Sequence, residues 1–224
     1  MITVHHLNNS RSQRILWLLE ELELPYEIKK YQRSQEGIAP PELSNIHPLG
    51  LAPIVTDGDL TLAESGAIVE YIVQKYGRSK VQPPDSGKIH DLYFKHYAEG
   101  TLMPILVNKL VFSIVPERSP FFIRPIARMM FGALTAKLVT PRLLAHAAYL
   151  EKHLEQDDKQ WFAGGEEPTI ADYMMSFPMD GWADGMPEAF GPNLKAYVKR
   201  MHDRPAYQRA LKQGGEYAYA KPSL

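Results

Sequence analysis

The sequence predicts an α/β unit with a mixed four-stranded sheet, followed by an all-helical unit. In the first 76 residues, short apolar strands alternate with amphipathic helices. A segment rich in proline and glycine follows, and after it apolar residues recur only at helical spacing. The 224 residues suffice for one large domain or two small ones. We therefore expect a first domain at 1–78, a linker at 79–87 and a helical domain at 88–224.

The α/β unit is expected to run in the order β-α-β-(short α)-β-β-α. The segment Asp57-Gly58-Asp59 is a strong hairpin signal, and Gly77 is placed to end the last helix. A right-handed crossover joins the first two strands. The apolar patterns place strands at 2–4, at 26–30, from 53 and at 60–63, and helices over 15–22 and 69–76.

The helical unit shows apolar residues at helical spacing over 143–154, 170–177 and 194–201. The segment Phe121–Val139 is rich in apolar residues but contains Arg124, Arg128 and Lys137, which predicts a buried or interface helix. The apolar stretch Ile105–Val115 is too short to span a membrane.

Composition excludes several classes of function. The 25 basic and 26 acidic residues leave a net charge of −1, which argues against nucleic-acid binding. The chain has no cysteine, so disulfides, zinc-thiolate sites, iron–sulfur clusters and a protein thiol nucleophile are excluded. Its eight histidines show no metal-binding spacing, so no metal is expected. Residues 1–6 do not resemble a signal peptide, which favours a cytoplasmic protein without a membrane partner.

The segment Asn8–Ser12 connects the first strand to the first helix. The free N–H groups and positive dipole end of a helix N-terminus favour an anion. Taken alone, Ser10 or Ser12 is more often simply an N-cap.

The segment His47–Val55 places Pro53 immediately before a strand, where its missing N–H costs least. A cis Ala52–Pro53 bond would present the Ala52 backbone to a ligand as an extra strand would. Taken alone, a trans bond is the better prediction, because cis forms are only about 5% of X–Pro bonds.

The segment Ala63–Ala67 joins the last strand to the next helix. Ser65 is expected as the N-cap, where its hydroxyl and the helix N–H groups would hold a ligand carboxylate, and Glu64 would receive a ligand ammonium. The alternative is a cap beside a solvated glutamate.

Together these segments resemble the cytosolic glutathione S-transferase family, closest to serine-type members of bacteria and fungi. The resemblance covers the whole chain and implies a thioredoxin-like glutathione-binding domain, with Pro53 as the cis-proline and Glu64-Ser65 holding the γ-glutamyl group. In the helical half, Pro168–Asp172 resembles the buried capping-box motif of the family, in which Thr169 caps the helix and Asp172 reaches back.

The resemblance implies glutathione as cosubstrate, with its thiol activated as thiolate for attack on a hydrophobic electrophile. It assigns the activating hydroxyl to Ser10, four residues before Arg14, with Ser12 or Asn9 as fallback donors. It assigns glutathione binding to His47, Ala52, Pro53, Glu64 and Ser65. Leu51 stands where relatives often hold the glycine carboxylate with a polar residue, so His47, Arg33 or Arg11 is expected to hold it.

The electrophile is expected to lie against the helical domain, near Tyr93, His96, Tyr97 and Met103. For His96 and most apolar side chains of this region, simple packing is the commoner role. Two alternative functions stay open, namely glutathione-dependent reduction of peroxides or disulfides, and non-catalytic ligand binding. The resemblance also implies a homodimer that pairs the N-terminal domain of one chain with the helical domain of the other.

Overall fold

A computed structural model describes residues 1–77 and 80–220. It confirms the mixed four-stranded sheet, with strand order β2-β1-β3-β4. Strand β1 runs parallel to β2 and antiparallel to β3, and β3 pairs with β4 across the predicted hairpin. The strands are β1 (Ile2–Leu7), β2 (Tyr26–Tyr31), β3 (Ile54–Asp57) and β4 (Leu60–Ala63).

Two helices, α1 (Ser12–Glu21) and α2 (Ser65–Ile72), pack on the sheet face that carries Val4 and Val55. The opposite face buries a smaller cluster of Leu7, Leu43 and Ile54 under the 3-10 turn Pro41–Asn45. A π-helical turn, Val73–Gly77, ends α2 at the predicted glycine. The predicted domain boundary at 78 and the first residue of the linker lie outside the described residues.

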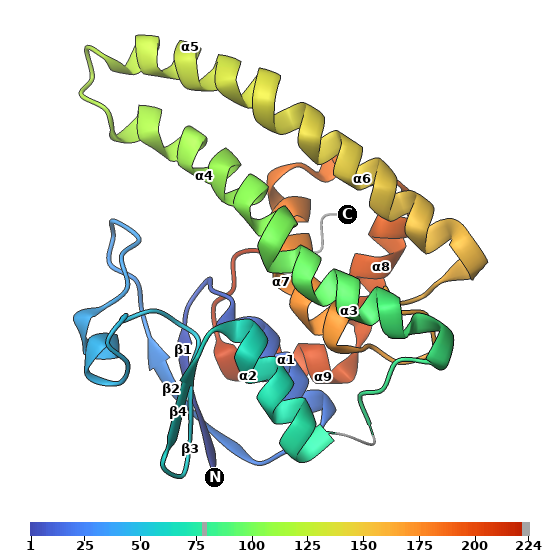
Figure 1. Cartoon of the computed structure of the whole chain (residues 1–224). Helices are drawn as coiled ribbons and strands as arrows, with labels where there is room; N and C mark the ends of the chain where they lie inside the picture. Colours follow the sequence, from blue (N-terminus) through green and yellow to red (C-terminus); the bar gives the residue numbers. More distant parts are fainter. Residues whose placement is uncertain (78–79, 221–224) are drawn as a thin grey trace.

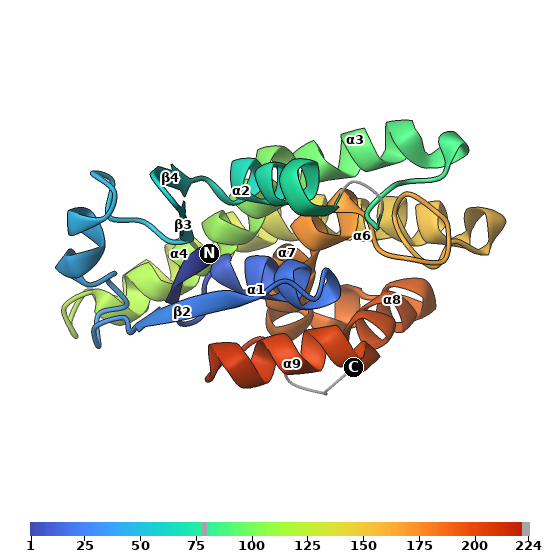
Figure 2. The same cartoon turned by 90° about the horizontal axis from the view of Figure 1, so that it is seen from below.

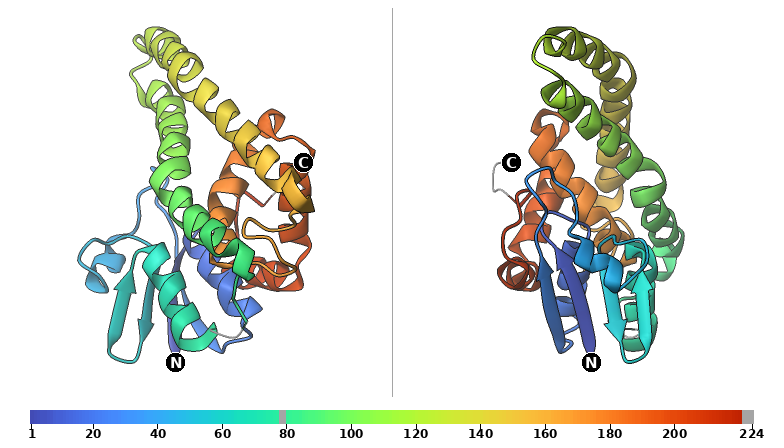
Figure 3. Two further views of the ribbon diagram at one scale, coloured as in Figure 1. Left: turned by 45° about the vertical axis from the view of Figure 1, so that its right-hand side comes forward. Right: turned by 90° about the vertical axis from the view of Figure 1, so that its left-hand side faces the viewer.

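From Asp85 onward, the described residues form helices and their connections, as predicted. The turn Ala98–Leu102 joins α3 to α4 without a break, and the turn Thr135–Val139 joins α5 to α6 in the same way. Each pair forms one long helix, and the two long helices lie side by side. The ends of α4 and α5 project beyond the rest of the molecule as a hairpin (Figure 1, Figure 3). The helices are α3 (Lys88–Tyr97), α4 (Met103–Arg118), α5 (Arg124–Leu134), α6 (Thr140–Glu155), α7 (Ile170–Gly185), α8 (Pro192–Asp203) and α9 (Pro205–Gly214); further 3-10 turns are Asp85–Gly87, Gln156–Asp158 and Pro187–Ala189.

The two halves share one continuous core. Trp17 of α1 is fully buried and meets Tyr173 of α7 edge to face, with ring centroids 4.7 Å apart. Helix α9 runs beside α1 on the side away from α3 (Figure 2). Burial of these aromatic surfaces holds the sheet unit against the helical unit.

The predicted capping box is present at the start of α7. Asp172 accepts the Thr169 N–H at 2.9 Å and the Phe162 N–H at 3.0 Å, and its side chain is fully buried. Burial raises the pKa of Asp172 to about 6, although these hydrogen bonds act in the opposite direction. The box therefore fixes the entry of the central helix rather than forming part of a reaction site.

The segment Phe121–Val139, predicted to be buried or at an interface, is not buried within the chain. Only Ala127 and Val139 of this described segment are buried. Because the hairpin extends past the body of the protein, most of its remaining apolar side chains stay exposed, although Phe131 packs against Phe112 of α4 with ring centroids 5.5 Å apart. Apolar content alone does not distinguish this arrangement from a core helix.

Candidate active site

The turn between β1 and α1 holds the predicted thiol-activating residues. Ser10 Oγ donates to Leu7 O at 2.7 Å, accepts the Ser12 N–H at 3.2 Å, and lies 2.7 Å from Ser12 Oγ. Both serines are buried, Ser10 with 4% of its surface exposed and Ser12 with none. Neither makes a side-chain N-cap hydrogen bond to α1, whose N-cap is Arg11.

A buried histidine continues this hydroxyl pair. Ser12 Oγ lies 2.8 Å from His6 Nδ1 and 3.2 Å from Leu7 O. Burial, assisted by the charge of Lys30, lowers the pKa of His6 to about 4. The ring is therefore neutral near pH 7, and one of its two nitrogens carries a proton. With that proton on Nδ1, His6 donates to Ser12 and Ser12 donates onward.

Asn9 occupies the left-handed region, with φ of 50°, where asparagine is one of the better tolerated residues. Its Oδ1 accepts the Ala218 N–H at 2.7 Å, so the C-terminal tail crosses the turn here. Within residues 1–77 and 80–220, its Nδ2 donates to no acceptor. The three predicted donors thus lie in one turn, but Asn9 alone is half-buried with a free donor.

The segment before β3 contains a cis Ala52–Pro53 bond, as the resemblance implies. Ala52 is half-buried, and neither its N–H nor its carbonyl makes a backbone hydrogen bond to the described residues. His47 is half-buried nearby in sequence, and its Nδ1 accepts the Leu49 N–H at 3.4 Å. Leu51 is 58% exposed. An extended ligand backbone can therefore pair with Ala52.

The start of α2 differs by one residue from the prediction. Glu64 is the N-cap, and Ser65 is the first helical residue. Glu64 has φ of 67° and ψ of 113°, a strained conformation that costs about 1–3 kcal/mol and is typical of ligand sites. The Ser65 hydroxyl accepts a hydrogen bond from Arg14 Nη1 at 3.0 Å instead of capping the helix.

Arg14 is the centre of a charged network that the sequence analysis missed. Only 1% of its surface is exposed, and its Nη1 lies 2.6 Å from Glu99 Oε1. Arg11 donates from Nε to the same carboxylate at 3.0 Å. Burial alone would raise the pKa of Glu99, but the two arginines outweigh burial and lower it. Arg14 Nε and Nη2 find no partner among the described residues.

One signal for this network was present in the sequence. Arg14 lies four residues before Leu18, on the stripe that α1 buries, and an arginine in an apolar stripe needs a partner. Glu99 carries no such signal, because it lies 85 residues away along the chain.

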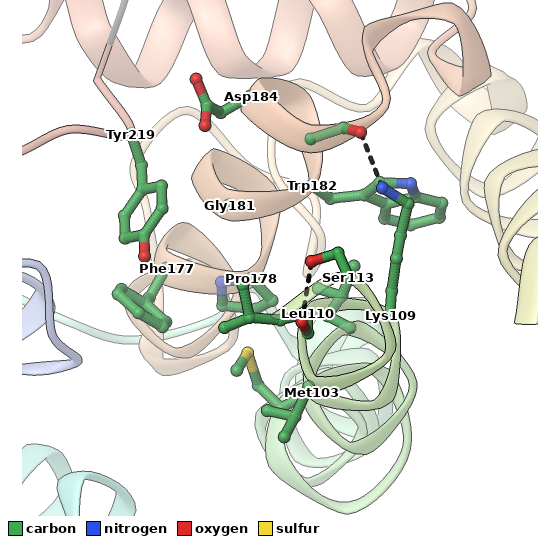
Figure 4. Close-up of a pocket in the computed structure, with 13 residues that line it drawn as sticks. Met103, Lys109, Leu110, Ser113, Phe177, Pro178, Gly181, Trp182, Asp184 and Tyr219 are labelled. Atoms are coloured by element: carbon green, nitrogen blue, oxygen red, sulfur yellow. Dashed lines mark hydrogen bonds between the residues drawn. The ribbon is translucent and has the colours of Figure 1, made fainter. Parts of the chain in front are cut away.

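A cavity of about 230 Å³ opens between α4, α7 and the C-terminal tail. Figure 4 shows Tyr219 and Phe177 on one side of it and the α4 side chains on the other. Lys109, Ser113 and Asp184 add polar groups, and the apolar lining comes from Met103, Leu106, Val107, Leu110, Phe177, Pro178, Trp182 and Tyr219.

Phe177 connects this cavity to the turn of α1. The guanidinium carbons of Arg11 and Arg14 lie 5.8 and 5.7 Å from its ring centroid. The ring centroid of Tyr219 lies 5.8 Å from that of Phe177, and the N–H of the preceding Ala218 donates a hydrogen bond to Asn9 Oδ1. The cavity is therefore next to the turn that carries the candidate donors.

Of the four residues predicted to contact an electrophile, Met103 lines this cavity. Tyr93 and Tyr97 stack on each other with centroids 5.6 Å apart, and both contact Tyr149 of α6 instead. The Tyr97 hydroxyl lies 2.7 Å from His146 Nδ1. His96 is exposed on α3.

Comparisons with known proteins identify the family of this chain. The family described as "Glutathione S-transferase, N-terminal domain" matches residues 1–74, and "Glutathione S-transferase, C-terminal domain" matches 122–213. Glutathione S-transferase 3 of Schizosaccharomyces pombe is 37% identical over 217 residues, which cover 95% of this chain and 88% of that protein. Glutathione S-transferase 1 of Saccharomyces cerevisiae is 34% identical over 80% of each chain.

A solved structure extends the likeness to three dimensions. The glutathione S-transferase of Actinobacillus pleuropneumoniae aligns with a TM-score of 0.73 and 30% identity, over 99% of this chain and 96% of that one. Sheet, helical unit and both domain matches lead to one conclusion: this chain belongs to the glutathione S-transferase family.

Proposed function

We propose that this protein is a glutathione transferase in which Ser10 stabilises the glutathione thiolate. The observation that carries this proposal is the buried chain from His6 through Ser12 to Ser10 at the N-terminus of α1. A hydroxyl proton rotates freely. When Ser10 turns its proton toward sulfur, its hydrogen bond to Leu7 O is lost. Leu7 O can then accept a hydrogen bond from Ser12 Oγ, which lies 3.2 Å away.

The energetic demand is within the reach of these groups. A free thiol has a pKa near ~8.5, and lowering it by ~2 units requires about 2.7 kcal/mol. One hydrogen bond to a charged group contributes roughly 1.5–3 kcal/mol, and the helix dipole about 0.3–1 kcal/mol. The two effects together suffice without a general base.

Glutathione would lie along the edge formed by Ala52 and the start of α2. Its cysteinyl backbone would pair with the free N–H and carbonyl of Ala52. Its γ-glutamyl carboxylate would meet Ser65 and the N–H groups of α2, and its ammonium would meet Glu64. The buried charge of Arg14, 3.0 Å from Ser65 Oγ, supports an anion there. We assign the glycine carboxylate to His47 and Arg33.

The electrophile would occupy the cavity between α4 and α7. Its lining is mainly apolar, which favours a hydrophobic substrate. Trp182 lines it and is fully buried, yet its Nε1–H has no acceptor among the described residues. A substrate that carries a hydrogen-bond acceptor would satisfy this donor.

Three alanine variants test the thiol assignment. Ser10→Ala should lower turnover of a halo-aromatic substrate by roughly 10- to 100-fold, as expected for loss of a hydrogen bond that contributes roughly 1.5–3 kcal/mol. Glutathione affinity, measured by calorimetry, should change little. Ser12→Ala should lower turnover less than Ser10→Ala does. Asn9→Ala should change turnover mainly because the C-terminal tail loses its hydrogen bond to Asn9. Ultraviolet titration of bound glutathione should show the thiol pKa rising in Ser10→Ala.

The other outcomes have clear meanings. Full turnover in Ser10→Ala together with loss in Asn9→Ala moves the donor to Asn9. Turnover of a hydroperoxide or a disulfide without turnover of halo-aromatics replaces transfer by reduction. No measurable glutathione binding leaves a non-catalytic ligand-binding protein.

We also propose that the protein is a homodimer. Exposed apolar side chains on α3 and α6 support this, because they offer a broad face beside the sheet unit. They are Ile89, Leu92, Tyr93, Leu144 and Tyr149. Sedimentation at micromolar concentration should give twice the chain mass of 25.4 kDa, and a monomer mass rejects the proposal.

A further inference from the structure

The end of the α4–α5 hairpin exposes a compact set of apolar side chains. We name residues 116–130 the hairpin tip; it extends beyond the body of the protein (Figure 1, Figure 3), and its Arg118 donates a hydrogen bond to Glu36 O in the loop after β2. Phe121 is 82% exposed and Phe122 is 67% exposed. Isolated apolar residues on a surface are ordinary, but a contiguous group marks a binding surface. The exposed members are Phe121, Phe122, Ile123, Ile126, Met129 and Met130.

Charge on the hairpin tip is mainly basic. Residues 116–130 contain three basic side chains and one acidic side chain, Glu117, which pairs with Arg128 at 2.9 Å, although the whole chain has a net charge of −1. An apolar surface with basic residues beside it is the pattern of a segment that lies on an anionic membrane surface. The basic residues of the hairpin tip are Arg118, Arg124 and Arg128.

We propose that the hairpin tip docks on the surface of an anionic lipid bilayer. Phe121, Phe122 and Met129 would enter the boundary between headgroups and acyl chains, and the basic side chains would meet the lipid phosphates. A second copy of this chain fits the hairpin tip less well, because the apolar face proposed for the dimer, on α3 and the second half of the α5–α6 helix, lies at the opposite end of the two long helices. This proposal departs from the sequence-based expectation of no membrane partner.

The contact is with the surface, and the long helix does not cross the bilayer. The continuous helix Asp85–Arg118 is long and apolar enough to span a membrane by length and composition alone. Its first half, however, buries Phe94, Tyr97 and Leu102 in the core shared with α7. A spanning helix would have to withdraw these side chains, whereas docking through the hairpin tip leaves the fold intact.

Flotation of the full-length protein with lipid vesicles tests the proposal without glutathione or substrate. Vesicles with one quarter phosphatidylserine should bind the protein, pure phosphatidylcholine vesicles should bind much less, and added salt should weaken the binding. The double substitution Phe121→Ser with Phe122→Ser should lower the partition coefficient by about tenfold or more. Leu49→Ser with Leu51→Ser, at residues 63% and 58% exposed on another loop, is the matched control and should leave it unchanged.

A charge variant and a sedimentation measurement complete the test. Arg124→Gln with Arg128→Gln should weaken binding to phosphatidylserine vesicles at low salt. The oligomeric mass of the phenylalanine variant should equal that of the parent. If that variant does not fold, Met129→Ser with Met130→Ser takes its place. The proposal is overturned if the parent does not bind anionic vesicles or if the serine variants bind as well as the parent. It is also overturned if those variants change the oligomeric mass, because a second copy then covers the hairpin tip.

Discussion

Arg14 Nη1 lies 2.6 Å from Glu99 Oε1 and 3.0 Å from Ser65 Oγ. One buried guanidinium therefore joins α1, the start of α2 and the turn between α3 and α4. The same side chain therefore holds both ends of the candidate glutathione site, at the starts of α1 and α2. It also holds the helical unit that forms the neighbouring cavity. Disturbing it should affect both folding and binding.

Replacing Arg14 with methionine should lower the free energy of unfolding by roughly 1.5–3 kcal/mol, because Glu99 loses one charged hydrogen-bond partner and keeps Arg11. Urea denaturation provides the measurement. The control is Arg209→Met, since Arg209 pairs with Glu20 while 50% exposed, and its loss should cost about 1 kcal/mol or less. Equal effects for the two variants would show that the Arg14 network adds nothing beyond a surface pair.

The buried His6 should make the protein sensitive to mild acid. The unfolded chain binds a proton on this histidine near pH 6.5, whereas the folded chain does so only near pH 4. The contribution of neutral His6 to the free energy of unfolding is therefore fully present above pH 6.5. It is lost as the pH drops through 4, by about 3 kcal/mol in total. The measurement is urea denaturation of wild type and His6→Asn across this range. The difference in free energy of unfolding between wild type and His6→Asn should narrow as the pH falls. A difference that does not change with pH contradicts the lowered pKa of His6.

Tyr219 should act on the electrophile rather than on glutathione, since its ring lines the cavity beside Phe177. Tyr219→Ala should raise the KM for an apolar electrophile by roughly tenfold, as loss of an aromatic contact of about 1.5 kcal/mol implies. Tyr219→Phe keeps the ring and should retain the KM. Calorimetry should give the same glutathione affinity for all three proteins, and a parallel loss of that affinity would place Tyr219 in the glutathione site.

The capping box should be a stability element with no role in the reaction. Thr169→Ala should lower the free energy of unfolding by about 0.5–2 kcal/mol, because the first turn of α7 loses its cap. Thr61→Ala, at an exposed position of β4, should change it by only about 0.5 kcal/mol or less. Thermal unfolding of both variants checks this, and kcat of the folded Thr169→Ala protein should match the parent at low temperature.

Local patterns in the chain predicted the order of strands and helices, the hairpin at Asp57-Gly58-Asp59 and the capping box at Thr169 and Asp172. They also led to the turn of Asn9, Ser10 and Ser12. Each of these features depends on residues within a few positions of one another, so spacing and turn chemistry suffice to find them.

Packing between distant segments set the rest. Glu99 reaches Arg14 across 85 residues, Ala218 reaches Asn9 across 209, and the cavity exists only where α4, α7 and Tyr219 meet. The exposure of Phe121 likewise follows from how far the hairpin extends past the body. Such contacts depend on the angles and lengths at which helices pack, and these arise from the whole folded chain rather than from the periodicity of any one segment.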